Sequence, residues 1–249
     1  MHEAAILIGA GLLAGAMNAL AGGGSFVSLS ALIALGVPSV AANASSTLSL
    51  YPGGLASVWV YRREGGPVCG APLPAMAALT LIGGLVGAVI LLRTPTAFFD
   101  GILPWLLLTA TLALAFARWL GEALRRRRQI SVAAICAGQF LLGVYGGYFG
   151  GAVGLMMMAF WSLVAGADLK TLQAPRTLLV TAANTAAVAF FALSGVVQWD
   201  KVAWLAPSAL LGGYVGALIG RRLSARYVRW ATLVLASTIT ALFFWRAYA

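Results

Sequence analysis

The stretch Ala21-Gly22-Gly23-Gly24-Ser25 lies in the middle of an apolar segment that runs from Ala5 to Gly36. As one continuous helix this segment would be about 48 Å long, whereas the hydrocarbon core of a bilayer is about 30 Å thick. Each glycine inside a helix costs about 1 kcal/mol relative to alanine, so three in succession disfavour a continuous helix. The stretch therefore predicts a broken helix, with two short arms joined at the glycines.

A second overlong segment, from Ile130 to Ala165, is interrupted in the same way by Gly146-Gly147-Tyr148-Phe149-Gly150-Gly151. The two interruptions belong to a repeat, because Gly22-Gly23 recurs as Gly150-Gly151 at an offset of 128. The motif that starts at Gly83 recurs at Gly212, at an offset of 129. This nearly constant offset predicts two homologous halves, residues 1–124 and 130–249, joined by a basic linker at 125–129.

The composition places the chain in a membrane. Of its 249 residues 61% are hydrophobic and only 9% are charged, whereas a soluble domain has about 25% charged residues. Successive apolar segments are each long enough to cross a bilayer. The net charge of +10 does not indicate nucleic acid, because the basic residues lie between these segments and fit membrane orientation. Met1-His2-Glu3 lacks a basic n-region, so we expect no cleavable signal peptide.

The basic residues also predict the topology. If each broken segment returns to its starting side, by re-entry or by two crossings, then 13 of the 16 Lys and Arg residues fall on one side, which is the cytoplasmic side. Both termini are then periplasmic, and each half crosses an odd number of times. We therefore expect an all-α integral membrane protein of two inverted-topology repeats, each a glycine-broken helix followed by three transmembrane helices. The 13 residues are Arg62, Arg63, Arg118, Arg125, Arg126, Arg127, Arg128, Lys170, Arg176, Arg221, Arg222, Arg226 and Arg229.

The glycine breaks are the first candidate site. Where the second arms begin, near Gly24-Ser25 and Ala152 to Gly154, backbone N–H groups lack helical partners and carry the positive end of the helix dipole. Such ends favour anions. The alternative is that the glycines only permit close helix crossing.

Two polar stripes follow the breaks and can either line a substrate path or bond neighbouring helices. Asn18, in the first broken arm, can join either stripe. The stripes consist of Asn43, Thr47, Tyr51 and Gly54, with Ser46 beside them, and of Gln173, Thr177, Thr181 and Asn184.

Arg176 has two possible orientations. Pointing inward, it is a fixed cation that attracts an anion; otherwise it snorkels to the cytoplasmic interface beside Lys170. Because Arg176 lies next to the polar stripe and not on it, about two turns from a helix start at Asp168, the pattern favours snorkelling. The matching position in the first half is Ser46.

The acidic residues lie only in connections or near segment ends, and the one histidine is His2 at the terminus. No buried carboxylate or histidine is then available for a proton relay, a metal site or acid–base catalysis. We therefore expect neither an enzyme, nor a cofactor, nor a bound metal. The small-residue runs at Gly83-xxx-Gly87 and Gly212-xxx-Gly216 predict close helix packing within one subunit. The acidic residues are Glu3, Glu64, Asp100, Glu122, Asp168 and Asp200.

The stretch from Leu13 to Ser25 resembles the signature opening of the TauE/SafE sulfite exporter family. The runs Leu35 to Thr47, Leu81 to Pro95 and Leu210 to Arg222 are similar to that family too, so the resemblance covers essentially the whole chain. It implies a bacterial inner-membrane permease for sulfite or another small organosulfur anion.

Together these features predict a secondary transporter for a small anion, most simply a sulfur oxyanion or organosulfonate, bound between the two glycine breaks. The alternatives are a carrier or channel for another small solute, and a membrane scaffold or assembly protein that transports nothing. The expected partners are the anion and the lipid bilayer, not nucleic acid, and monomer and homodimer stay open. The candidate binding residues are Asn18, Gly22, Gly23, Gly24, Ser25, Asn43, Thr47, Gly150, Gly151, Gly154, Gln173, Arg176 and Thr177.

Overall fold

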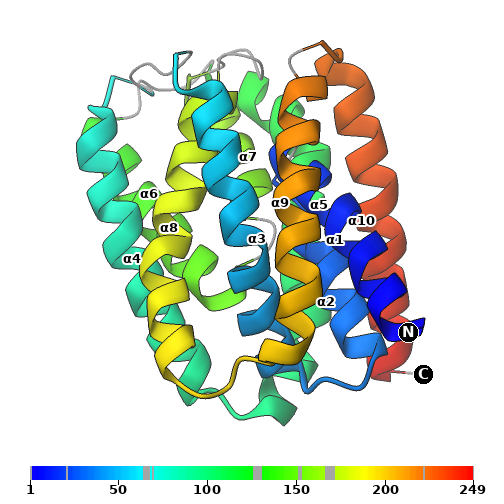
Figure 1. Ribbon diagram of the computed structural model, residues 1–249. Coiled ribbons are helices and arrows are strands. Elements are labelled where there is room, and N and C mark those ends of the chain that lie inside the picture. The colour runs from blue at the N-terminus through cyan, green and yellow to red at the C-terminus, as the bar shows by residue number, and fades with distance from the viewer. Residues whose placement is uncertain are drawn as a thin grey trace.

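The computed structural model describes residues 2–20, 22–63, 68, 70–125, 131–150, 153–165, 172–220 and 222–248. Ten helices account for nearly all of this part of the chain (Figure 1). They are α1 His2–Leu20, α2 Ser25–Ala34, α3 Ser39–Tyr61, α4 Leu73–Arg93, α5 Thr96–Arg125, α6 Val132–Phe149, α7 Val153–Ala165, α8 Gln173–Leu193, α9 Trp199–Gly220 and α10 Ala225–Tyr248.

Both predicted helix breaks are confirmed. The first overlong segment divides into α1 and α2, and the second divides into α6 and α7. The chain reverses at Gly22, with φ of 83°, and at Gly150, with φ of 65°. These φ values lie in the left-handed region that favours glycine. Each helix is therefore broken at a residue where a side chain would strain the turn.

Seven helices in the described part of the chain are long and apolar enough to cross a membrane. The remaining helices α2, α3 and α7 do not meet these criteria for a membrane span. With 10 and 13 residues, α2 and α7 are too short. With 23 residues α3 is long enough, but its hydroxyl and amide side chains make it more polar. The chain is therefore a multi-pass, all-helical membrane protein.

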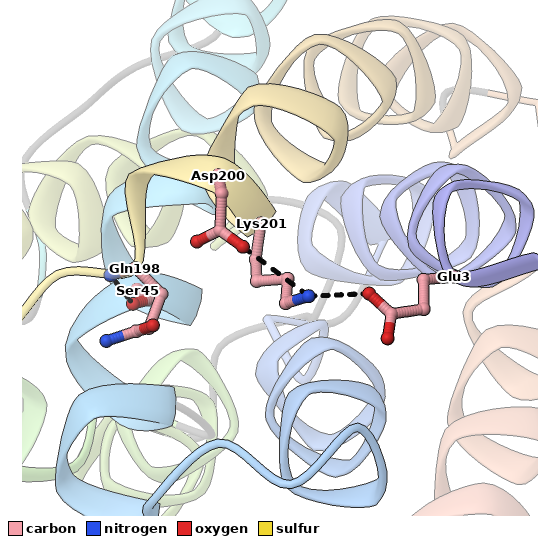
Figure 2. A network of polar contacts seen from close by, with 5 residues as sticks. All are labelled: Glu3, Ser45, Gln198, Asp200 and Lys201. Atoms are coloured by element: carbon pink, nitrogen blue, oxygen red, sulfur yellow. Dashed lines mark hydrogen bonds and ion pairs between the residues drawn. The ribbon is translucent and has the colours of Figure 1, made fainter. Parts of the chain in front are cut away.

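The helices stand side by side in one bundle, with both termini at the same end (Figure 1). The C-terminal ends of α3 and α9 lie at the opposite end, and they are followed closely in the chain by Arg62, Arg63 and Arg222. At the end with the termini, Lys201 donates to Glu3 over 2.6 Å and lies 3.4 Å from Asp200 (Figure 2). Basic charge at that end is thus partly neutralised.

Small residues hold together two pairs of helices drawn from different halves. α1 packs along α9, where Gly15 faces the backbone of Ala209 and Gly213, and Gly216 faces Ala16. Likewise, α4 packs along α6. There Gly83 faces Phe140 and Gly143, while Gly87 faces Val144, Gly147 and Tyr148. The predicted use of these glycine runs, close packing inside one subunit, is confirmed.

A large apolar cluster packs beside the first broken helix and fixes its second arm, α2. Phe26 and Leu29 of α2 lie in it together with Phe99 and Leu103 of α5. All four side chains are almost completely buried. The cluster therefore holds α2, whose ten residues could not form a stable helix alone, in a fixed position below the first break.

Candidate functional site

The two glycine breaks touch one another inside the bundle. A methyl group built on Gly22 would lie only 2.7 Å from the Cα of Gly154 and 3.0 Å from Nη1 of Arg176. A methyl group on Gly154 would meet the Cα of Gly22 at 2.8 Å. Backbone therefore lies against backbone here, and the guanidinium of Arg176 lies beside Gly22.

Arg176 does not snorkel, so the orientation that the sequence pattern favours is wrong. Its side chain is only 1% exposed, and Nη2 donates to the carbonyl of Ala19 over 2.6 Å. Two structural facts explain the difference. The described part of α8 begins at Gln173, not at Asp168, which lies outside the described residues together with Lys170. Arg176 is then in the first turn, beside the open carbonyls at the end of α1.

The guanidinium of Arg176 is only partly satisfied. Nη2 has the contact to Ala19 and a longer one, 3.4 Å, to the hydroxyl of Thr177, but Nε and Nη1 have no hydrogen-bond partner. Among the described residues, the ion pairs involve only Lys201, Glu3 and Asp200, so Arg176 has no carboxylate partner there. A buried charge without a counter-charge is strongly unfavourable.

Two predicted amides make the same contact at the two breaks. Gln173 donates from Nε2 to the carbonyl of Leu20 over 3.0 Å, and Asn43 donates from Nδ2 to the carbonyl of Tyr148 over 3.0 Å. Leu20 and Tyr148 occupy matching positions near the ends of α1 and α6. Each amide thus satisfies a carbonyl that the broken helix leaves open, and each belongs to the other half of the chain.

The amide oxygens of both residues remain unpaired. Asn43 Oδ1 and Gln173 Oε1 are buried and have no hydrogen-bond partner. The predicted threonines differ from each other. Thr177 donates to the carbonyl of Gln173 over 2.8 Å, whereas the hydroxyl of Thr47 lies against Gly150 without a partner.

The start of α2 supplies backbone donors. Gly23, Gly24 and Ser25 are buried, and the described residues provide no backbone acceptor for their N–H groups. Gly24 packs so closely on α1 that an added methyl group would meet the Cβ of Asn18 at 2.7 Å. At the corresponding start of α7, Gly151 and Ala152 lie outside the described residues.

A small cavity opens beside the first break, with room for about one water molecule. The predicted residues Asn18, Arg176 and Thr177 line it, whereas Asn43 and Thr47 do not. The other lining residues are Gly54, Ser57, Val180 and Thr181. Of these, Gly54 and Thr181 are members of the predicted polar stripes. Ser57 is absent from the prediction, although it continues the α3 stripe by one further helical turn.

Other buried polar side chains outside the predicted set form a satisfied network. Gln139 of α6 donates to Thr80 over 2.8 Å and accepts from the indole of Trp161 over 3.1 Å. Because both ends of this amide are paired, the network links α4, α6 and α7 and offers nothing to a ligand. The unpaired atoms of Arg176, Asn43 and Gln173 at the breaks differ from this network, because their hydrogen-bonding capacity is not used by the fold.

The chemistry of the first break suits an anion. It combines a buried cation at Arg176, the positive end of α2 and neutral donors, inside a chain that crosses a membrane many times. No group of three or more His, Cys, Asp or Glu side chains gathers in the described part of the chain. The fold and the site thus define a membrane transporter.

The comparison with protein families agrees with this class. Residues 7–243 match the family described as sulfite exporter TauE/SafE, and the chain belongs to that family. The resemblance of its opening stretch is therefore confirmed.

Three relatives with assigned names are similar over most of the chain. A "probable membrane transporter protein" of Haemophilus influenzae is 26% identical over 95% of this chain and 92% of its own length. A "probable membrane transporter protein ORF9" of Sinorhizobium sp is 28% identical over 89% of this chain and 83% of its own. The "probable membrane transporter protein YfcA" of Escherichia coli K12 is 28% identical over 88% and 79%. No solved structure matches the chain.

Proposed function

We propose that this protein is a secondary transporter that carries a small sulfur oxyanion or organosulfonate, with sulfite as the simplest substrate. The carrying observation is the guanidinium of Arg176, which is 1% exposed and has Nε and Nη1 unpaired beside Gly22. The family name indicates sulfite, and the names of the relatives indicate transport without a substrate.

The anion would bind in the cavity beside the first break. Two sulfonyl or sulfite oxygens can accept from a parallel pair of donors on the planar guanidinium of Arg176, either Nε with Nη2 or Nη1 with Nη2, because Nη2 carries a second hydrogen beside the one it donates to Ala19. Asn18 and the N–H groups of Gly23 and Gly24 would complete the donor set, and Thr177 would contact the remaining oxygen. Since the cavity has room for only about one water molecule, the described state would be a closed one, and binding would require the two breaks to separate.

The architecture for such a motion would be two inverted-topology repeats, residues 1–124 and 130–249. Three features support this. The amide contacts to Leu20 and Tyr148 recur at matching positions, the helix pairs α1–α9 and α4–α6 correspond, and the termini share one end of the bundle. Alternating access in repeat transporters moves one unit against the other around a fixed midplane site.

The orientation would be that of a bacterial inner-membrane protein with both termini in the periplasm. The concentration of Lys and Arg in connections at the opposite end supports a cytoplasmic location of that end. On this orientation the cavity would be reached alternately from the two sides when the breaks separate.

The experiment is anion flux in proteoliposomes that contain the purified full-length chain. Sulfite, sulfate, thiosulfate, sulfoacetate and taurine are each tested for saturable uptake and for stimulation by the same anion inside the vesicle. A saturable, self-exchanging response to one sulfur anion is expected. Unsaturable flux would indicate a channel, and no response to any of these anions would overturn the proposal.

A further inference from the structure

The second break carries two buried oxygen atoms that have no hydrogen-bond partner among the described residues. Asn43 and Thr47 are 0% and 2% exposed, and their Oδ1 and Oγ1 atoms have no hydrogen-bond partner. Both side chains are held against the end of α6, because Asn43 Nδ2 bonds to Tyr148 and Thr47 Oγ1 lies against Gly150. Two buried acceptor oxygens are thus fixed, one turn of α3 apart, beside the same reversal of the chain.

The free hydroxyl of Thr47 is unusual within this protein. Thr80, Thr111, Thr181, Thr232 and Thr240 all donate to the carbonyl four residues earlier in their own helices. So does Thr177, which matches Thr47 in the repeat and donates to Gln173. A membrane-buried hydroxyl normally makes this local bond. Thr47 does not make this bond, and its hydroxyl oxygen lies against Gly150 at the break.

The two breaks also differ in charge. At the first, the guanidinium of Arg176 binds the carbonyl of Ala19 in the last turn of α1. The residue that matches Arg176 is Ser46, which instead bonds to Ser28 over 2.6 Å. In the described part of the chain no cationic side chain reaches the last turn of α6. The negative end of that helix therefore has no built-in positive charge.

We propose that a monovalent alkali cation binds at the second break, where it takes the place that the guanidinium of Arg176 holds at the first. Its ligands would be Oδ1 of Asn43, Oγ1 of Thr47 and backbone carbonyls at the end of α6. Neutral oxygens of this kind suit hard cations, and the ends of broken helices supply them in transporters. A divalent ion is disfavoured, because it prefers carboxylate ligands, and within the described part of the chain no carboxylate contacts Asn43 or Thr47.

The cation would be coupled to the anion through the contact between the breaks. Gly22 lies beside Arg176 and touches Gly154 at the start of α7, immediately after the second break. A cation that orders the end of α6 would thereby favour the closed arrangement in which the anion is held. This coupling rests on the proposed function, whereas binding of the cation itself does not.

The test is binding of ²²Na⁺ to the purified full-length chain in detergent, without any anion substrate. Saturable binding is expected, displaced by unlabelled NaCl but not by choline chloride, with KCl as a second competitor. Thr47→Val keeps the shape and removes the oxygen, so it should weaken binding on the order of tenfold or more. Thr47→Ser keeps the oxygen and should bind like the unmodified chain.

Thr238→Val is the matched control. The hydroxyl of Thr238 is exposed on α10 and donates to Val234 in its own helix, so its loss should leave ²²Na⁺ binding unchanged. Absence of saturable binding by the unmodified chain would overturn the inference, and so would Thr47→Val binding as tightly as Thr238→Val.

Flux measurements separate this inference from the proposed function. Anion flux that is saturable but identical in NaCl and choline chloride, with no ²²Na⁺ binding, would remove the cation site and leave the anion carrier. Saturable ²²Na⁺ binding without flux of any sulfur anion would retain the cation site and remove the anion carrier.

Discussion

Gly22 and Gly154, which come from different halves of the chain, lie backbone against backbone where the two broken helices meet. This contact predicts that Gly22→Ala is strongly destabilising. The new methyl group would lie 2.7 Å from the Cα of Gly154 and would also strain a residue with φ of 83°. Together we expect a loss of about 2–4 kcal/mol, measured as a lower midpoint of thermal unfolding in detergent.

Gly36→Ala is the control for backbone strain alone. Gly36 has the same φ of 83°, but an added methyl group there would meet nothing within 4 Å. We expect it to lose only about 1 kcal/mol. Equal losses for Gly22→Ala and Gly36→Ala would mean that the contact between the breaks does not exist.

Arg176 should be required for anion flux and not only for folding. Arg176→Gln keeps a donor for the carbonyl of Ala19 but removes the positive charge, so we expect saturable sulfur-anion flux to fall by about 100-fold or more, a loss of at least about 2.7 kcal/mol in binding. Arg176→Lys keeps the charge but cannot bind through two parallel hydrogen bonds. Its flux should lie between that of the unmodified chain and that of Arg176→Gln.

The control for Arg176 is Arg62→Gln. Arg62 lies exposed at the end of α3, where its guanidinium stacks 3.6 Å from the ring of Trp59. Its loss removes the same charge from the surface and should leave the flux within about twofold, since exposed charges contribute little. If Arg176→Gln transports as well as Arg62→Gln, the guanidinium of Arg176 serves only to bind the end of α1.

The helix pair α1–α9 should be sensitive to small added groups. Gly216→Ala places a methyl group 2.5 Å from the Cα of Ala16, and because backbone cannot yield like a side chain we expect a loss of about 1–3 kcal/mol. Gly101→Ala in α5, where nothing lies within 4 Å, should instead be neutral or stabilising by up to about 1 kcal/mol. The comparison is again the midpoint of thermal unfolding, and an unchanged midpoint for Gly216→Ala would contradict the packing.

The proposed orientation can be tested with an impermeant thiol reagent. In a Cys136→Ser background, Cys69 should react only from the cytoplasmic side. Ser194→Cys, in the exposed connection between α8 and α9 at the end with the termini, should react only from the periplasmic side. Reaction of both positions from the same side would contradict the odd number of crossings in each half.

The sequence predicted the helix breaks, because glycine runs and segment length act locally. It also identified the amides at 43 and 173, since polar side chains in a membrane helix must face the interior. The inward orientation of Arg176 could not be predicted, because it depends on where α8 begins and on the carbonyls of α1, which are 157 positions away in the chain. Tertiary contacts of this kind leave no periodic pattern.

The difference between Thr47 and Thr177 was equally invisible. Both follow an amide by four positions and both lie on a polar stripe, yet only Thr177 bonds to its own helix. The difference lies in the contact with Gly150, where the tight turn of the chain packs against the hydroxyl of Thr47. A turn in one half thus decides the side-chain geometry of the other, which a single helix pattern cannot encode.

The amide contacts between the halves also bear on how the protein is made. The carbonyl of Leu20 is satisfied by Gln173, which lies 153 positions later in the chain, and α1 packs along α9, so α1 is synthesised well before the helices that pack against it. Before Gln173 is in place the carbonyl of Leu20 would lack this partner, and an unpaired carbonyl in the bilayer core is costly. We therefore expect α1 to be held beside the insertion machinery, or sheltered by a chaperone, until α8 and α9 have been synthesised.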